Sequence, residues 1–479
     1  MSRMAWRVAP AAACLLLLAC GGQESSSDLV VSNVTVISPE RAAPLERAYV
    51  RIRDGRIAEV SERPLHGAVE IDGTGRYLVP GLIDSHVHLA VAPGFPAGMT
   101  GEHAAAHREI VAAALVQDPR SYLFYGFTTV VDLVGTGERM AQWNAYEVRP
   151  DAYFCGAAAT IAGQIRLVRF PYFSYDAPPE ERIPPAADLA QHTPEAVVAR
   201  IAEDGAICLK TIYEEGLTQT VEEGRALVAA AHERGLPVFI HANRKEGQAF
   251  AVAAGVDVIV HGMWRDSGEE AALDEEAREI LAAIAREGIG YQPTTQVIMG
   301  LYDILDEDYL DRSELADAYP RVLIEWYASG PGASTAYGVG DGDSAAEARL
   351  RETIGRATEV TALLADVDAR LLFGSDTPSD RLYTNPPGLN GRLEMDNWIS
   401  AGVSEEKLFH ALTLDNVRAV GLDGQIGTVE AGKVANLLLL RADPLASVDA
   451  YDTIETVFLH GRPIQRQFLS ARNPPGNQP

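Results

Sequence analysis

The stretch 78–91, LVPGLIDSHVHLAV, strongly constrains what this chain can fold into. An apolar run of the kind that forms a buried strand ends here in the polar pattern Asp84-Ser85-His86-Val87-His88. Side chains at positions i and i+2 of a strand lie on the same face, so His86 and His88 project together. Two imidazoles side by side at the end of a core strand predict a pair of ligands for one metal ion.

Short apolar runs alternate with helical patterns through the middle of the chain. One helical segment begins after Thr193, an N-cap residue, and another ends at Gly235, a common helix stop. Because most of the runs end in a polar residue and helices separate them, the pattern predicts an α/β chain that folds as a (β/α)8 TIM barrel. The eight runs are VPGLIDSHVHL, FTTVVDLV, AYFCGA, AICLKTIY, PVFIHAN, VDVIVHG, GIGYQPT and RLLFGSD.

Both ends of the chain contain short β-rich runs separated by turns. LVVSNVTVIS and AYVRIRDGRIAEV lie near the start, with a turn at Asp54-Gly55, and VANLLLLRADP and ETVFLHGRPI lie near the end. They predict a small β-sandwich built from residues 29–78 and 421–470, beside a barrel at 79–420. Residues 300–355 are too long for a simple connection and predict a helical insertion or lid over the barrel mouth.

The active site of a TIM barrel lies at the carboxyl ends of its strands. Here those ends carry four histidines, one lysine and one aspartate. Imidazoles and a carboxylate that converge are typical ligands of zinc or a similar divalent ion. Each residue alone has an ordinary structural interpretation, such as a turn cap for the aspartate, but their shared position favours a metal site. The candidates are His86, His88, Lys210, His241, His261 and Asp376.

The order of these residues resembles that of the amidohydrolase superfamily, and within it the imidazolonepropionase-like and Xaa-Pro dipeptidase-like metal-dependent hydrolases. The resemblance covers nearly the whole chain after its N-terminal segment. It includes a start pattern, DGRIAEV followed by GRYLVPGLIDSHVHL, and an end pattern, LTLDNVRAVGLDGQIGTVEAGKVANLLLL. It implies an enzyme that hydrolyses a C–N bond in a small substrate such as a dipeptide or an N-acyl amino acid.

The resemblance also implies a role for each matched residue. Two divalent ions, expected to be zinc, would be bridged by Lys210 after its carboxylation by carbon dioxide. Burial beside cations favours this reaction because it lowers the pKa of a lysine and leaves the amine neutral. A hydroxide between the ions would attack the substrate carbonyl, and the catalytic residue Asp376 would carry its proton to the leaving nitrogen. The ligands of one ion would be His86, His88 and Asp376, and those of the other His241 and His261.

The loops after the strands are expected to contact the substrate. Where dipeptidase relatives often have Gly-Gly-His, this chain has Ala162-Gly163-Gln164, which makes Gln164 one candidate contact in place of a histidine. Tyr213, just beyond Lys210, is the other candidate. Arg166 and Arg169 could bind a substrate carboxylate but also fit as ordinary solvated loop residues. Cyclic amides and lactones stay open as alternative substrates, because the metal chemistry does not specify the acyl group.

The first residues have the layout of a secretory signal. Arg3 and Arg7 precede an apolar stretch that is too short to span a bilayer. Leu17-Leu18-Ala19-Cys20 resembles a bacterial lipobox, which implies removal of residues 1–19 as a signal peptide and lipidation of Cys20. Gly21, in place of an aspartate, suggests the outer membrane of a Gram-negative cell envelope. Residues 20–28 would then be a linker, and residues 471–479 are expected to form a flexible tail.

The two cysteines in the middle of the chain, Cys155 and Cys208, both lie inside apolar runs. Cysteine is often buried as a small hydrophobic residue, so we expect unpaired side chains in buried strands although an oxidising compartment would allow a disulfide.

Charge narrows the range of partners. With 67 acidic and 40 basic residues the net charge is -27, which argues against nucleic acid and leaves a small-molecule substrate, with membrane contact through the lipid anchor. The sequence leaves open whether the chain forms a homo-oligomer. A function of another class is a surface lipoprotein that binds a ligand without catalysis. Such a protein should have lost one or more of the six candidate ligands, and none is missing.

Overall fold

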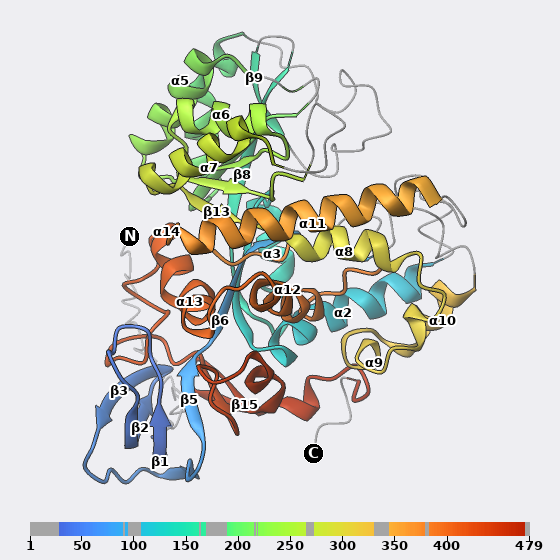
Figure 1. The fold of residues 1–479 in the computed structure, drawn as a ribbon. Helices are drawn as coiled ribbons and strands as arrows, with labels where there is room; N and C mark the ends of the chain where they lie inside the picture. Colours follow the sequence, from blue (N-terminus) through green and yellow to red (C-terminus); the bar gives the residue numbers. More distant parts are fainter. Residues whose placement is uncertain are drawn as a thin grey trace, which may run out of the picture.

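The structure is a computed structural model and contains two large sheets and many helices, with the strands β1, β2 and β3 projecting to one side (Figure 1). It describes residues 28–89, 92–93, 107–161, 164–168, 189–214, 217, 219–264, 273–329, 344–378 and 383–474. The expected signal peptide, the lipidation site Cys20, Ala162-Gly163 and Arg169 lie outside the described residues.

One sheet, here called the parallel sheet, occupies the middle of the chain. Its strands follow the order β13-β12-β11-β10-β8-β7-β6 and pair in parallel, as strands joined by helical crossovers do. A further strand, β9, pairs antiparallel with β8 and was not expected from the sequence. The strands are β6 (Leu82–Val87), β7 (Phe127–Asp132), β8 (Asp151–Ile161), β9 (Gln164–Val168), β10 (Cys208–Ile212), β11 (Val238–His241), β12 (Val258–Val260) and β13 (Gly290–Gln292).

The eighth apolar run lies between the two edges of the parallel sheet. Residues 370–377 form isolated parallel bridges instead of a continuous strand: Leu371 pairs with Tyr291 of β13, and Thr377 pairs with Val87 of β6. Seven of the predicted runs are therefore strands of one parallel sheet, and the eighth contacts both of its edges. The prediction of a mixed α/β fold with parallel strands is confirmed.

The second sheet, here called the end sheet, combines strands from both ends of the chain in the order β16-β15-β14-β5-β1-β2-β3, with β4 paired to β1. β1 is parallel to β4 and β5, and the other neighbours are antiparallel. Asp54 and Gly55 form the predicted turn, both at positive φ. The strands are β1 (Leu29–Val36), β2 (Leu45–Arg53), β3 (Arg56–Ser61), β4 (Val69–Asp72), β5 (Tyr77–Pro80), β14 (Leu437–Leu440), β15 (Ile454–Leu459) and β16 (Arg462–Gln465).

Helices cover the parallel sheet, with α5, α6 and α7 grouped together in Figure 1. Thr193 caps α4, as its sequence predicts. The described part of 300–355 is helical, and its last helix, α11, runs beside α8. The helices are α2 (Arg108–Phe124), α3 (Gly137–Trp143), α4 (Pro194–Glu203), α5 (Val221–His232), α6 (Lys245–Ala254), α7 (Glu275–Glu287), α8 (Thr295–Asp303), α9 (Leu315–Ala318), α10 (Arg321–Ala328), α11 (Ser344–Asp366), α12 (Leu389–Ser400), α13 (Glu405–His410) and α14 (Asn416–Ala419), with short turns η1 (Leu189–His192), η2 (Tyr309–Asp311), η4 (Ala411–Asp415), η5 (Val448–Thr453) and η6 (Arg466–Phe468).

A polar network joins the two sheets at the start of β8. The Asn436 side-chain amide donates to Asp151 Oδ2 at 2.7 Å, and the backbone amide of His460 donates to Asn436 Oδ1 at 2.8 Å. His460 Nε2 lies 2.8 Å from Asp151 Oδ1, a contact that raises the pKa of this imidazole. Because Asp151 begins its strand, the end sheet contacts the amino ends of the parallel strands, away from the carboxyl ends.

The expectation of unpaired cysteines is wrong. Cys155 of β8 and Cys208 of β10 lie directly opposite each other in the parallel register, with their Cα atoms 4.4 Å apart, and form a disulfide. Both are buried, as predicted, among apolar residues of neighbouring strands. The pairing depends on the register between two strands that are 53 residues apart in sequence, so local composition could not predict it.

Replacing both cysteines with alanine is expected to lower the free energy of unfolding by about 4 kcal/mol, because the cross-link closes a 53-residue loop in the unfolded chain. Urea unfolding with and without reductant measures this difference. Reductant should weaken the parent protein and leave the double variant unchanged. Equal midpoints for the two proteins under oxidising conditions would contradict the prediction.

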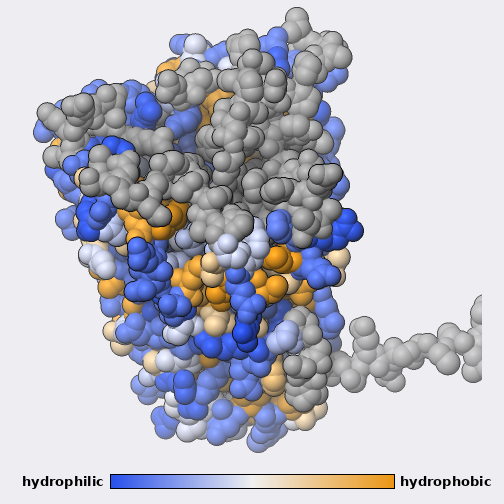
Figure 2. All heavy atoms as spheres, turned by 90° about the vertical axis from the view of Figure 1, so that its right-hand side faces the viewer, coloured by the Kyte–Doolittle hydropathy of each residue, from blue (hydrophilic) through white to orange (hydrophobic). Residues whose placement is uncertain are grey.

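The described surface is largely hydrophilic. On the face shown in Figure 2, hydrophilic residues cover most of the described area, and hydrophobic residues gather near its centre. Among the described residues, the large hydrophobic side chains that are exposed belong to Val69, Val116, Val322 and Val367. Within the described part of the chain, no helix combines the length and the apolar character needed to cross a membrane.

Candidate metal centre

Five of the six predicted ligand positions lie near or just beyond the carboxyl ends of their runs, and Lys210 is the middle residue of β10. The strand residues that precede these positions are buried. Lys210 is 3% exposed and His86 is 1% exposed, so neither can be an ordinary surface residue. The positions are His86 in β6, His88 directly after it, Lys210 in β10, His241 at the end of β11, His261 after β12, and Asp376 in the segment 370–377.

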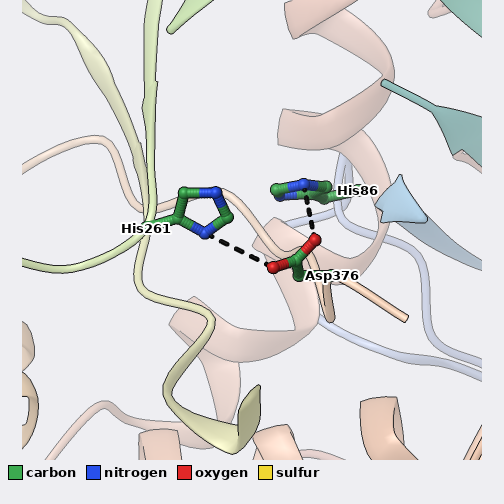
Figure 3. A group of neighbouring side chains, drawn as sticks. All are labelled: His86, His261 and Asp376. Carbon is green, nitrogen blue, oxygen red and sulfur yellow. Dashed lines mark ion pairs between the residues drawn. The ribbon is translucent and has the colours of Figure 1, made fainter. Parts of the chain in front are cut away.

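Asp376 lies at the centre of this group. Its Oδ1 atom is 2.8 Å from His88 Nε2 and 3.0 Å from His86 Nε2, while its Oδ2 atom is 3.6 Å from His261 Nδ1. Figure 3 shows the carboxylate between the His86 and His261 rings, with an ion pair drawn to each. The backbone supports this arrangement, because Asp376 N donates to His86 O at 2.7 Å.

The histidine rings form a continuous group. The ring centroids of His86 and His88 are 5.4 Å apart, those of His86 and His261 are 5.0 Å apart, and those of His261 and His241 are 4.5 Å apart. The structure therefore places His241, from the neighbouring strand, next to His261. The four strand-end histidines thus form one connected group of rings.

Within this cluster, burial and neighbouring charges shift the pKa values of the side chains in opposite directions. Burial lowers the pKa of His86 to about 4. Burial also lowers the pKa of His88, but its interactions with Asp132 and Asp376 outweigh that effect and raise the pKa to about 9. For Asp376, burial favours the neutral acid, but the adjacent His86, His261 and His88 hold its pKa well below its usual range. The carboxylate is therefore ionised at neutral pH.

Lys210 has an environment that suits a neutral amine. Burial lowers the pKa of Lys210 to about 7, against the opposing charge of Asp376. A lysine with this pKa is largely neutral slightly above pH 7 and can act as a nucleophile toward carbon dioxide. The charge of Lys210 in turn helps to lower the pKa of His86, which indicates that the two groups are near each other.

Two buried carboxylates in this region were missed by the sequence reasoning. Asp132, the last residue of β7, has its Oδ1 atom 3.9 Å from His88 Nδ1 and accepts from Arg139 Nη1 at 3.2 Å. Asp84 accepts hydrogen bonds from the Ser375 hydroxyl and backbone amide, so it links the His86 strand to the Asp376 segment. Asp132 is the polar residue near the end of the run FTTVVDLV, so the strand-end rule could have selected it.

The donor set fits a divalent metal ion. His86, His261 and Asp376 each offer a ligand atom, and these atoms lie within 4.8 Å of one another. Zinc bonds of about 2.0–2.2 Å require ligand atoms within roughly 4 Å of each other, so small side-chain shifts would complete the site. Four imidazoles, a carboxylate and a neutral amine are also the ligand types that borderline divalent ions prefer.

A family comparison agrees with this geometry. The model of the amidohydrolase family matches residues 77–464, from the last strand of the N-terminal part of the end sheet to its C-terminal strand. The chain belongs to the amidohydrolase family. It is accordingly a hydrolase that acts on carbon–nitrogen bonds, and the family is typically metal-dependent.

Individual proteins are similar to most of this chain. An imidazolonepropionase of Anaeromyxobacter dehalogenans is 25% identical over 364 residues, which cover 68% of this chain and 82% of that protein. The crystal structure of a Xaa-Pro dipeptidase with bound methionine matches with a TM-score of 0.64 and 19% identity, covering 92% of this chain and 100% of that one. Ochratoxinase from A. niger matches with a TM-score of 0.66 and 19% identity, covering 94% and 99%. At these identities the structural matches show the fold alone.

The two predicted substrate contacts of this amidohydrolase lie in different surroundings. The Tyr213 ring packs on Phe250 of α6, with centroids 4.7 Å apart, and its backbone amide donates to His241 O at 2.9 Å. Gln164 begins β9, and its side-chain oxygen accepts from Arg166 Nη2 at 3.0 Å. Tyr213 is thereby tied to a candidate ligand. The substrate role of both residues stays a prediction.

Tyrosines of the helical insertion brace the segments that carry the candidate ligands. Tyr309 and Tyr319 donate to the backbone oxygens of Thr384 and Tyr383 at 3.0 and 2.9 Å, beyond Asp376. Tyr327 donates to Pro93 O, beyond β6. Tyr309, Tyr319 and Tyr327 are all buried. The described part of the insertion therefore supports the loops around the site.

Replacing Tyr309 and Tyr319 with phenylalanine is expected to lower the free energy of unfolding by about 1–3 kcal/mol per substitution, because each leaves a buried carbonyl without its donor. Chemical unfolding measures the change. Tyr49→Phe, on the end sheet, is the matched control and should shift stability by less than about 0.5 kcal/mol. A double variant as stable as the control would show that these hydroxyls do not hold the loops.

Proposed function

We propose that this amidohydrolase is a binuclear metal-dependent enzyme that cleaves the amide bond of a small substrate, such as a dipeptide or an N-acyl amino acid. The observation that carries the proposal is the position of Asp376, whose carboxylate contacts His86, His88 and His261 at the ends of parallel strands. An ionised carboxylate surrounded by imidazoles beside a buried lysine has the composition of a hydrolytic metal centre.

The proposed ligands divide into two groups joined by one residue. His86, His88 and Asp376 would hold one ion, and His241 and His261 would hold the other. Lys210, as a carbamate, would supply an oxygen to both, and the pKa of about 7 that burial gives its amine favours that reaction. Zinc is the proposed metal because imidazole and oxygen ligands suit it.

Bound divalent ions would supply an acidified water and polarise the carbonyl under attack. The residues of the chain then have distinct tasks. His86 and His88 hold Asp376 Oδ1 in place, so that the carboxylate can accept the proton of the attacking water and return it to the leaving nitrogen. The low pKa of Asp376 keeps it in the form that accepts this proton.

The substrate class is supported by the kinds of protein that resemble this chain. The structural relatives include a Xaa-Pro dipeptidase and a putative prolidase, while an imidazolonepropionase favours a cyclic amide as a second candidate. Hydrolysis assays on dipeptides, N-acyl amino acids, cyclic amides and lactones would separate these classes. The proposal expects turnover of linear amides by metal-loaded protein. Turnover of cyclic amides or lactones alone would replace the proposed substrate, and ligand binding without turnover would favour the non-catalytic alternative.

We further propose that residues 370–377 close the parallel sheet into a (β/α)8 barrel and that the end sheet forms a β-sandwich. The bridges of Leu371 and Thr377 to opposite edges of the sheet support the closure. In native-state hydrogen exchange, the amides of Leu372 and Asp376, which donate to β13 and β6, should be as protected as those of neighbouring strands. Rapid exchange of both would indicate an open sheet.

A lipid anchor is the proposed mode of localisation. The lipobox-like sequence before Cys20 supports cleavage at that position and attachment to the outer membrane of a bacterial cell envelope. Metabolic labelling with radioactive palmitate tests this: the parent protein should be labelled and recovered with outer membranes, whereas Cys20→Ser should be unlabelled. Absence of label from the parent protein would contradict the proposed lipid anchor.

A further inference from the structure

Besides Asp376, which has φ 54°, two residues near the metal centre adopt a left-handed backbone conformation that residues other than glycine rarely adopt. His261 has φ 75° and Thr294 has φ 48°. They follow neighbouring strands, β12 and β13, and both are buried, with exposures of 3% and 0%. Left-handed conformations at non-glycine residues cost free energy and persist where the surroundings impose them, often at functional sites. Their joint occurrence at one strand end points to a constraint between them.

That constraint is a direct hydrogen bond. His261 Nδ1 lies 3.0 Å from Thr294 Oγ1, which is within hydrogen-bond range. The same nitrogen is 3.6 Å from Asp376 Oδ2, which is beyond that range. The backbone adds a second link between the two loops, because Gly262 N donates to Pro293 O at 3.0 Å. The His261 ring is therefore held from the side of Thr294.

The conformation of Thr294 is fixed in turn from α12. The buried carboxylate of Glu394 accepts from the backbone amides of Thr295 and Gln296, at 3.1 and 2.6 Å, and from Trp398 Nε1 at 3.0 Å. These amides belong to the first turn of α8. The first amides of a helix have no hydrogen-bond acceptor within the helix itself. Glu394 thus caps α8 in place of a side chain from Thr294 and leaves the threonine hydroxyl available to His261.

We propose that Thr294 is a positioning residue for His261. Its hydroxyl oxygen accepts a hydrogen bond from Nδ1–H, which leaves the lone pair of Nε2 for a metal ion and directs the Nδ1 proton away from Asp376. Metal-binding histidines in general donate their second ring nitrogen to such a partner, which sets the tautomer and the ring orientation. The inference rests on the proposed binuclear function, and it names residues outside the predicted ligand set.

Two variants distinguish the effect of the Thr294 hydroxyl from the effect of the side-chain shape. Thr294→Val keeps the branched side chain and removes the oxygen, whereas Thr294→Ser keeps the oxygen and removes the methyl group. Metal-free protein is titrated with Co2+, and binding is followed by visible absorption and by calorimetry. Thermal unfolding of the metal-free proteins serves as the control for folding.

The parent protein and Thr294→Ser are expected to bind two equivalents with similar affinity. Thr294→Val is expected to bind one of the two about 10–100-fold more weakly, with an altered absorption spectrum. Equal binding by parent and Thr294→Val would overturn the inference, and so would equal losses in Thr294→Val and Thr294→Ser. A parent protein that binds fewer than two ions would instead overturn the proposed function, and this inference with it.

A second measurement does not depend on the variants. In metal-free parent protein, the 15N chemical shifts of His261 report which ring nitrogen carries the proton. The inference predicts protonated Nδ1 and unprotonated Nε2. The opposite tautomer would show that Thr294 donates to the ring and does not set it for metal binding.

Discussion

Asp376→Asn is expected to reduce kcat/KM by about a thousandfold while the protein keeps its metal, because general acid–base groups contribute roughly 10²–10⁴-fold to a rate. Asparagine keeps an oxygen that can face His86 and His88, as Asp376 Oδ1 does at 3.0 and 2.8 Å. It cannot take up a proton, since an amide is not a base at neutral pH. Steady-state kinetics and elemental analysis on the same preparation measure the two properties.

The matched control is Asp151→Asn. Asp151 begins β8, at the amino ends of the strands, and contacts Asn436 and His460. It should lower stability and leave kcat/KM within about threefold of the parent value, since no candidate ligand contacts it directly. Unchanged turnover in Asp376→Asn would contradict the proposal that Asp376 carries the proton. Loss of both metal and activity would show that Asp376 acts as a metal ligand and would leave its role as proton carrier unsupported.

Lys210→Ala is expected to have the second large effect: loss of one metal ion per chain and of nearly all turnover. The reason is that a bridging carbamate gives an anionic oxygen to both ions, and no other described side chain in the cluster occupies its place between β8 and β11. Removing the amine also relieves the burial of a group whose pKa is about 7, so the folded state should survive. Inductively coupled plasma mass spectrometry gives the metal content.

Lys407→Ala is the control for Lys210→Ala. Lys407 pairs with Asp368 at 2.8 Å, away from the cluster, so its removal should change neither metal content nor rate. Short-chain carboxylic acids offer a further test, because an acid that occupies the space left by Lys210→Ala can replace the carbamate oxygens. Full metal content in Lys210→Ala without added acid would exclude the bridging role.

Position along the strands made much of the site predictable. A polar residue that ends a buried strand must face the same edge of a parallel sheet as the others, whatever the loops do. His86, His88, His261 and Asp376 could therefore be grouped from their runs alone, and the structure brings them together. The same reasoning reached the α/β class and the strands of the parallel sheet.

Features that depend on contacts between distant segments were not predictable in the same way. Thr294 follows a strand as an unremarkable threonine, and its value lies in a hydrogen bond to His261 that only the fold creates. The Cys155–Cys208 disulfide needs the register of two strands, and Glu394 lies in the middle of α12, far in sequence from the helix that it caps. Asp132 is different: it is the last residue of β7, so its place at the strand end is visible in the sequence itself.

The central claim is that this chain holds two metal ions at the ends of its parallel strands. Metal content per chain, measured by elemental analysis of protein that starts after Cys20 and is purified without chelator in bicarbonate, tests it most directly. The account predicts two equivalents of a divalent metal. One equivalent would indicate a mononuclear amidohydrolase and would contradict the bridging role of Lys210. No metal, even after reconstitution with zinc, would contradict the proposed metal-dependent catalysis altogether.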